Sequence, residues 1–154
     1  MTPLHLIAGA IGLAASGFVA LGIKSQKGKA PGLQNLNVKD SRLADCGTSP
    51  NCVCSEEDTQ PERYVKPLMA TMEDAVNAIE AMGGTITTRR DDYISATFMS
   101  KTFKFVDDVE LRDGGTAGIH IRSSSRVGYS DQGANRRRVK ALRAKLDETA
   151  INLS

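Results

Sequence analysis

The sequence lacks the short motifs that mark the common catalytic and nucleotide-binding sites. None of G-x-S-x-G, H-E-x-x-H, the P-loop or G-x-G-x-x-G occurs in it, so nothing points to those hydrolase, metalloprotease or nucleotide-binding classes. The chain contains only two histidines, His5 and His120, and neither lies beside an obvious nucleophile. Because histidine is the usual proton carrier at neutral pH, this scarcity favours a non-enzymatic protein, and we expect no cofactor.

Cysteine is also scarce, and its spacing leaves three interpretations open. Cys46, Cys52 and Cys54 lie in the turn-forming stretch CGTSPNCVCSEED, and no C-x-x-C redox pair is present. Zinc sites normally show paired C-x2–4-C spacing, and His120 is the only distal histidine that could complete such a site. We therefore favour a disulfide between Cys46 and Cys52 over free thiols, and both over a metal site.

Charge is missing from one long stretch near the N-terminus. From Leu6 to Ile23 the chain runs for eighteen residues without a charged side chain, which is just enough for a helix to cross a bilayer. We interpret residues 1–23 as a membrane anchor in preference to two alternatives, a cleaved signal peptide and a buried soluble helix. A signal peptide normally begins with lysine or arginine, and neither precedes this stretch.

The side of the membrane stays open. Lys24, Lys27 and Lys29 follow the apolar stretch and favour the cytoplasmic side by the positive-inside tendency. A disulfide between Cys46 and Cys52 would instead require an oxidising compartment. We expect an extracytoplasmic domain, against the indication of the lysines.

The remaining chain predicts a tether over residues 24–45 and one small domain over residues 46–150. Helical spacing follows Thr71 as N-cap and ends at Gly83-Gly84, and a second helix is expected from Ser130 or Asp131 to Glu148. Between them, β-rich segments joined by turns predict four strands, at residues 85–89, 93–99, 103–112 and 117–123. The expected fold class is α+β, with an antiparallel sheet of about four strands packed with two helices and preceded by one apolar N-terminal helix.

The most unusual segment is RSSSRVGYSDQGANRRR at residues 122–138, which carries five arginines. Arginines beside a helix N-terminus can hold a phosphate or carboxylate. In a structural alternative, Asp107 or Asp108 on the adjacent strand receives Arg122 or Arg126, and Asn135 ties the helix start to the turn. We favour the structural corner over an anion pocket, and either over catalysis. The candidate residues are Arg122, Ser124, Arg126, Asp131, Asn135, Arg136, Asp107 and Asp108.

Charge is distributed unevenly along the chain. Residues 46–118 carry seven basic and thirteen acidic side chains, whereas residues 119–154 carry eight basic and three acidic ones. This asymmetry predicts complementary surfaces within one fold. The basic final helix has no interleaved aromatic residues for base stacking. We therefore expect the basic face of this helix to be solvated, with a lipid headgroup as the next most plausible contact. Nucleic acid is not expected as a partner, and the sequence does not identify a protein partner.

Three blocks of sequence carry a resemblance to a known family. They are CGTSPNCVCSEED at residues 46–58, FVDDVEL at residues 105–111 and IRSSSRVGYSDQGANRRRVKALR at residues 121–143. Together they resemble the bacterial and plastid domain-of-unknown-function family numbered 1499 (DUF1499), except that Cys54 stands where that family usually has serine. The resemblance implies a fold unit over about residues 40–148, often preceded by a membrane segment, and implies no established activity.

Overall fold

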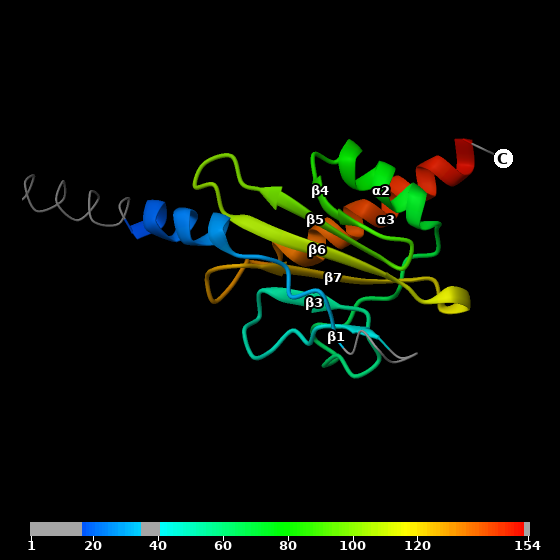
Figure 1. Cartoon of the computed structure of the whole chain (residues 1–154), viewed down its shortest axis with the longest axis horizontal. Coiled ribbons are helices and arrows are strands. Elements are labelled where there is room, and N and C mark those ends of the chain that lie inside the picture. The colour runs from blue at the N-terminus through cyan, green and yellow to red at the C-terminus, as the bar shows by residue number, and fades with distance from the viewer. Residues whose placement is uncertain (1–16, 35–40, 153–154) are drawn as a thin grey trace, which may run out of the picture.

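The computed structural model describes residues 17–34 and 41–152. Its centre is a five-stranded antiparallel sheet in the order β3-β7-β6-β5-β4 (Figure 1). The strands are β3 (Cys52–Cys54), β4 (Thr85–Arg89), β5 (Tyr93–Met99), β6 (Val106–Asp113) and β7 (Ile119–Ser125). The α+β class and the antiparallel sheet agree with the sequence-based expectation.

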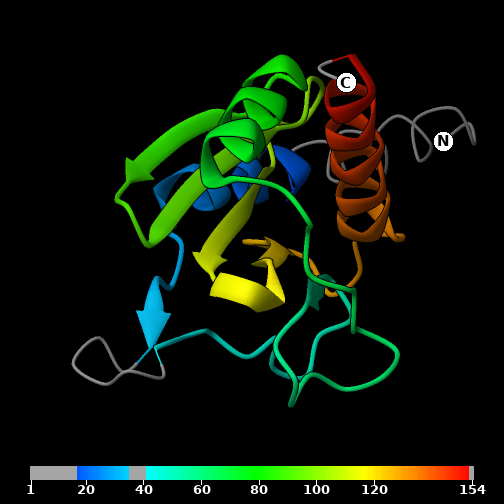
Figure 2. The same ribbon diagram turned by 90° about the vertical axis from the view of Figure 1, so that its right-hand side faces the viewer.

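Two helices cover one face of this sheet. Helices α2 (Met72–Ala81) and α3 (Ala134–Asn152) contact each other; α2 also contacts β4 and β5, and α3 contacts β3 and β7. Figure 2 shows them side by side on one face, with the short strand β1 (Leu33–Gln34) on the opposite side. The main core lies beneath the helices, because the alternate residues of the strands that point there are mostly apolar.

Helix α2 forms as its local sequence predicts. The Thr71 hydroxyl accepts a hydrogen bond from the Asp74 N–H at 3.1 Å, which satisfies one of the free donors of the first turn. Ala75, Val76 and Ile79 are buried in the core. Gly83 follows the helix at a φ of 84°, a backbone conformation that glycine adopts without a steric cost.

The expected strand count was wrong by one. Strand β3 pairs with β7 through Cys52↔Ser124, Val53↔Ser123 and Cys54↔Arg122. It has only three residues and lies within a turn-forming stretch, so no alternating pattern marked it in the sequence. A separate two-stranded sheet pairs β1 with β2 (Arg42–Leu43).

Three elements begin later than predicted. Strand β7 begins at Ile119 and not at residue 117, because Gly115–Ala117 form a 3-10 helix. Strand β6 begins at Val106 and not at residue 103, because residues 100–105 form the β5–β6 connection, which Ser100 N–H closes by donating to the Phe105 carbonyl at 2.8 Å. Helix α3 begins at Ala134, because Gln132 and Gly133 have φ angles of 52° and 80°. Both angles lie in the left-handed region, which an α-helix of L-residues excludes.

The chain before β1 packs against the domain as well. Residues 17–27 are helical, and Ser25 is buried with its hydroxyl accepting the Val106 N–H at 2.8 Å. Leu33 and Leu43 enter a second apolar cluster with Tyr93 and the three cysteines. The predicted tether has no core of its own, whereas in the described part of residues 24–45 Leu33 and Leu43 are buried against the sheet.

The predicted anchor at residues 6–23 lies mostly outside the described residues. Within the part of the chain that the structure describes, no helix has the length and apolar character needed to cross a bilayer.

Candidate anion-binding site

The sheet face opposite the helices carries a layer of charged side chains. Successive residues of a strand point to opposite faces, so β6 directs Asp108, Glu110 and Arg112 away from the helices while Val109 and Leu111 enter the main core. The antiparallel register brings three pairs together across β6 and β7: Asp108↔Ser124, Glu110↔Arg122 and Arg112↔His120. Of these three pairs, Glu110↔Arg122 places an acidic side chain directly opposite a basic one.

Arg122 and Glu110 form the most deeply buried of these pairs. The Arg122 Nη1 donates to Glu110 Oε2 at 2.9 Å and to Ser124 Oγ at 2.8 Å. The other Glu110 oxygen, Oε1, accepts from the Tyr93 hydroxyl at 2.7 Å and from the Gly32 N–H at 2.8 Å. Glu110 is 0% exposed and Arg122 is 9% exposed. Burial and the adjacent Glu110 raise the pKa of Tyr93 far above its usual range, so the phenol remains a donor.

Arg126 is fully engaged with Asp108. Its Nε and Nη2 donate to the two carboxylate oxygens at 2.8 and 2.7 Å, and its Nη1 donates to the Ser25 carbonyl at 3.2 Å. The hydrogen bonds to Asp108 raise the pKa of the Arg126 guanidinium above its usual value. Arg126 therefore holds the N-terminal segment against the sheet, and Asp108 occupies its forked donor edge.

Arg112 is engaged in the same way with Glu56. Its Nε and Nη2 donate to Oε1 and Oε2 of Glu56, each at 2.9 Å, and Glu56 Oε1 also accepts from the Leu43 N–H at 2.9 Å. Burial alone would raise the pKa of Glu56, but the hydrogen bonds and charge of Arg112 and the Leu43 N–H together lower it below its usual value. The ring of His120 lies 3.6 Å from Glu56.

The other face of the sheet carries the structural corner. Asn135 is fully buried; its amide nitrogen donates to the Asn51 carbonyl at 2.9 Å and to Ser125 Oγ at 3.1 Å, and its oxygen accepts from Ser123 Oγ at 2.7 Å. Arg138 bridges this group to Asp107 by donating to both Asn135 and Asp107. These contacts tie α3 to β7, to β6 and to the residue that precedes β3.

The start of α3 is not available to an anion. The Asp131 carboxylate accepts from the Gly133 N–H at 2.9 Å and from the Asn135 N–H at 2.7 Å. Arg136 points elsewhere, donating to the carbonyls of Tyr64 and Glu62. The helix terminus and Arg136 thus make structural contacts at the place where an anion pocket was the alternative to the structural corner.

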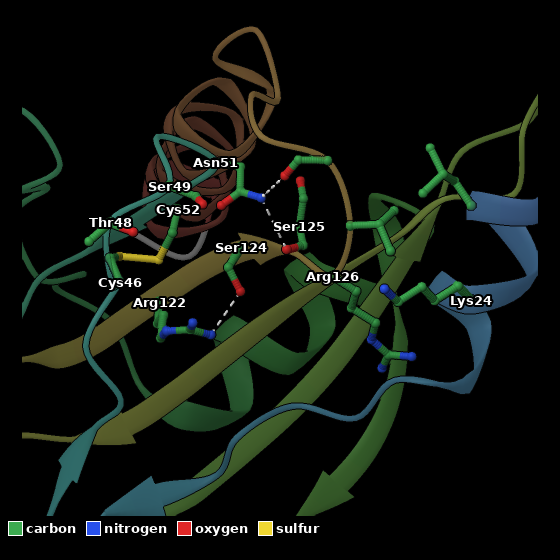
Figure 3. Close-up of a pocket in the computed structure, with 14 residues that line it drawn as sticks. Lys24, Cys46, Thr48, Ser49, Asn51, Cys52, Arg122, Ser124, Ser125 and Arg126 are labelled. Atoms are coloured by element: carbon green, nitrogen blue, oxygen red, sulfur yellow. Dashed lines mark hydrogen bonds between the residues drawn. A yellow bond between two sulfur atoms is a disulfide. The ribbon is translucent and has the colours of Figure 1, made fainter. Parts of the chain in front are cut away.

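A cavity of about 460 Å³ lies beside Arg122 on the charged face. Its lining residues are Leu21, Lys24, Cys46, Gly47, Thr48, Ser49, Asn51, Cys52, Arg122, Ser124, Ser125, Arg126, Val127 and Gly128. Figure 3 shows the cavity between the cysteine loop and the N-terminal helix, with Lys24 beside Arg126. The lining contains three basic side chains, several hydroxyls and no carboxylate, so the cavity favours negative charge.

Arg122 differs from the other two arginines of this face. Its Nε is buried and has no hydrogen-bond partner among the described residues. No described residue accepts a hydrogen bond from its Nη2 either, since both of its hydrogen bonds leave from Nη1. The Nε–Nη2 edge, which Arg112 and Arg126 use to hold carboxylates, is therefore unoccupied in Arg122.

The match to known families fits this architecture. A family model described as "Protein of unknown function (DUF1499)" matches residues 42–146. The chain belongs to the DUF1499 family. No curated protein and no solved structure matches it.

The DUF1499 match covers the whole five-stranded sheet and most of α3, whereas Leu21 and Lys24 precede it. The three sequence blocks that resemble the family form the cysteine loop with β3, strand β6, and the β7–α3 corner. They meet around Arg122, because β3, β7 and β6 are neighbours in the sheet. The family unit therefore builds one wall of the cavity, and the N-terminal helix adds the other.

The cysteine loop forms part of the family wall. Cys46 and Cys52 are joined in a disulfide, and Cys54 is a buried free thiol. Burial raises the pKa of the Cys54 thiol above its usual value, so it is a poor nucleophile. Within the described ranges, no cluster of three or more His, Cys, Asp or Glu side chains is suited to a metal ion.

The candidate residues from the sequence thus separate into two groups. Arg122, Ser124 and Arg126 line the cavity, with Asp108 behind Arg126 on the same face. The other face or the α3 start holds Asp107, Asp131, Asn135 and Arg136. Sequence reasoning missed Glu110, Glu56 and Lys24. The strand alternation around FVDDVEL could have indicated Glu110, since it places Asp108 and Glu110 on one face, but no local signal connects Glu56 or Lys24 to this site.

Proposed function

We propose that this protein is a membrane-tethered, non-enzymatic binding domain whose cavity accepts a small anionic group, a carboxylate or a phosphate. The observation that carries the proposal is the unoccupied Nε–Nη2 edge of Arg122 beside a cavity without carboxylates. A guanidinium edge binds planar or tetrahedral oxyanions through two parallel hydrogen bonds.

The surrounding groups favour the same kind of occupant. Lys24 is exposed at the cavity wall and has no carboxylate partner among the described residues. The hydroxyls of Thr48, Ser49 and Ser124 also line the cavity and can donate to oxygen atoms. Glu110 and Asp108 lie behind the arginines, where they fix the guanidinium groups without entering the lining.

Binding is favoured over catalysis because the lining lacks histidine, carboxylate and free thiol side chains. None of the lining residues is a histidine, an aspartate, a glutamate or a free cysteine, and these are the usual groups for proton transfer or nucleophilic attack. A bound anion would therefore meet only hydrogen-bond donors and fixed positive charge.

The uncharged stretch at residues 6–23 supports the tether. We place the domain on the extracytoplasmic side, because the Cys46–Cys52 disulfide persists in oxidising compartments. In such a compartment the disulfide, and with it the cysteine-loop wall of the cavity, would stay intact.

The test is thermal stabilisation of the full-length protein by inorganic phosphate and by acetate. A ligand at one hundred times its Kd stabilises the folded state by about 2.7 kcal/mol, which a shift in melting temperature would reveal. Lys24→Ala should weaken the binding about fivefold, as expected for the loss of one partly exposed charge contact of about 1 kcal/mol. Lys27→Ala is the matched control, because Lys27 is exposed one turn away and does not line the cavity.

Arg122→Lys tests the central group directly. It keeps a positive charge opposite Glu110 and removes the forked edge, so the fold should persist while anion stabilisation is lost. Arg122→Ala is less informative, because stranding a buried carboxylate costs about 3–5 kcal/mol. The proposal fails if neither anion raises the melting temperature of the wild type. It also fails if Lys24→Ala and Lys27→Ala are stabilised equally by the anion.

A further inference from the structure

Exposed apolar side chains gather at one end of the molecule. Among the described residues, ten large hydrophobic side chains are exposed, and seven of them lie on the N-terminal helix, the β5–β6 connection with the adjoining end of β5, or the β7–α3 connection. They are Phe18, Val19, Leu21, Ile23, Met99, Phe103 and Tyr129. Figure 1 shows these three segments at the same end, where the N-terminal helix leaves the sheet. We call residues 17–24, 99–105 and 127–130 the apolar end.

The N-terminal helix is fixed to this end by specific contacts. The rings of Phe18 and Phe103 stack with centroids 4.9 Å apart, and Phe103 stacks on Phe105 at 5.7 Å. At the other end of the helix, Ser25 accepts the Val106 N–H and Arg126 donates to the Ser25 carbonyl. The helix therefore has a defined direction relative to the sheet, and the three segments form one surface.

Basic side chains predominate in and beside the apolar end, although Asp107 and Asp131 border it, because both line a cavity together with Phe18 and Leu21. Residues 17–29, 99–105 and 126–130 contain no aspartate or glutamate. Their charged residues are Lys24, Lys27, Lys29, Lys101, Lys104 and Arg126. Exposed aromatic and apolar side chains ringed by lysines are the pattern of segments that enter a membrane interface and contact anionic headgroups.

We propose that the apolar end lies in the interface of an anionic lipid bilayer, with Met99, Phe103 and Tyr129 among the headgroups. This inference rests on the proposed membrane tether and adds a fixed orientation to it. The uncharged stretch of residues 6–16 leads directly into the helix at this end, so a tether there would bring the connections to the same lipid surface. A protein partner with an acidic surface could also pair with the lysines. It would not explain why the uncharged stretch of residues 6–16 leads into this end.

The orientation has a consequence for the cavity. Leu21, Lys24, Val127 and Gly128 line it and lie in the apolar end. The cavity would then open at the level of the headgroups, with β3 and the cysteine loop on its far side.

Single-tryptophan variants of the full-length chain test the orientation, because the sequence contains no native tryptophan. Met99 is 55% exposed at the apolar end, and Met69 is 77% exposed and lies outside it. Met99→Trp and Met69→Trp therefore form a matched pair. Each variant is reconstituted into vesicles of phosphatidylcholine and phosphatidylglycerol that carry bromine atoms near the top of the acyl chains, and vesicle-bound protein is isolated by flotation.

We expect the fluorescence of Met99→Trp to be quenched by the brominated lipid by half or more and shifted to the blue, while Met69→Trp shows neither change. Omitting phosphatidylglycerol should reduce the quenching of Met99→Trp, because the lysines then lose their anionic contacts. If both variants float and Met99→Trp is not quenched, or if both are quenched equally, the orientation is wrong although the tether stands. If neither floats, the tether and the orientation fail together. Anion binding at Arg122 is judged separately, by the thermal stabilisation of the wild type and of the Lys24, Lys27 and Arg122 variants.

Discussion

At the scale of single residues, three arginines on one sheet face have different roles because of what meets their forked edge. Arg112 meets Glu56 and Arg126 meets Asp108, each through two hydrogen bonds. Arg122 is held by its Nη1 alone. Carboxylates occupy the forked edges of Arg112 and Arg126. Arg122 is therefore the arginine of this face whose Nε and Nη2 donors can bind a ligand.

Glu56 predicts how the stability of the protein depends on pH. Its pKa is lower in the folded protein than its usual value of 4.5, so the unfolded chain takes up the proton first as pH falls. The stabilisation by ionised Glu56 is therefore complete above about pH 4.5 and is lost as the pH falls through the folded pKa. In urea unfolding, Glu56→Gln should lower the free energy of unfolding by about 3 kcal/mol at pH 7, because Arg112 loses its charged partner.

The matched control for this experiment is Glu57→Gln, since Glu57 is adjacent and exposed. It should change the free energy of unfolding by no more than about 0.5 kcal/mol. Between pH 7 and pH 3, Glu56→Gln should also lose less stability than the wild type. Parallel pH profiles for the wild type and Glu56→Gln would contradict the assignment of this carboxylate.

At the scale of elements, helix α3 is oriented by one amide. Asn135 joins the first turn of α3 to the Asn51 carbonyl before β3 and to the serines of β7. A narrow apolar stripe of Val139, Leu142 and Leu146 packs on the core, and the polar corner fixes the direction in which the helix leaves the sheet.

Asn135→Ala should destabilise the protein by about 3 kcal/mol, because it leaves several buried donors and acceptors unpaired and each costs about 1–3 kcal/mol. Asn77→Ala is the control, since Asn77 is exposed on α2 and alanine has the higher helix propensity. That variant should be neutral or slightly more stable in chemical unfolding. Equal stability of the two variants would show that the Asn135 corner contributes little.

The elements also differ in how far the local sequence predicts them. Helix α2 has its cap, its apolar spacing and its terminating glycine within one short stretch, and its prediction was confirmed. Strand β3 has three residues in a loop-like context and exists because β7 offers it an edge. A local pattern cannot report a pairing whose partner lies about seventy residues away.

At the scale of the whole molecule, the described N-terminal helix packs against the domain. Gly22 is buried against the backbone of Phe103, where an added Cβ would collide with the Phe103 carbonyl oxygen. Gly17, one and a half turns earlier, has no neighbour within 4 Å of such an atom. The close approach at Gly22 therefore sets how the helix meets the β5–β6 connection.

Gly22→Ala should loosen the helix from the sheet, because overpacking of this kind costs about 1–3 kcal/mol. Trypsin should then cleave the full-length protein after Lys24 and Lys27 about tenfold faster, which corresponds to about 1.4 kcal/mol. Gly17→Ala should be cleaved at the wild-type rate. If Gly22→Ala is also cleaved at that rate, the helix is not held at this position.

The sequence by itself determined the α+β class, the central strands and helix α2, and the family, because these depend on spacing and motifs within short stretches. It also indicated that Asp107 and Asp108 point to opposite faces, which follows from strand geometry alone. The choice of partner for each arginine was decided only by the tertiary structure. Glu56 reaches Arg112 across 56 positions of sequence and Ser25 reaches Val106 across 81, and such pairings depend on strand order and register. For the same reason, the cavity beside Arg122 exists only where the family fold and the N-terminal helix meet.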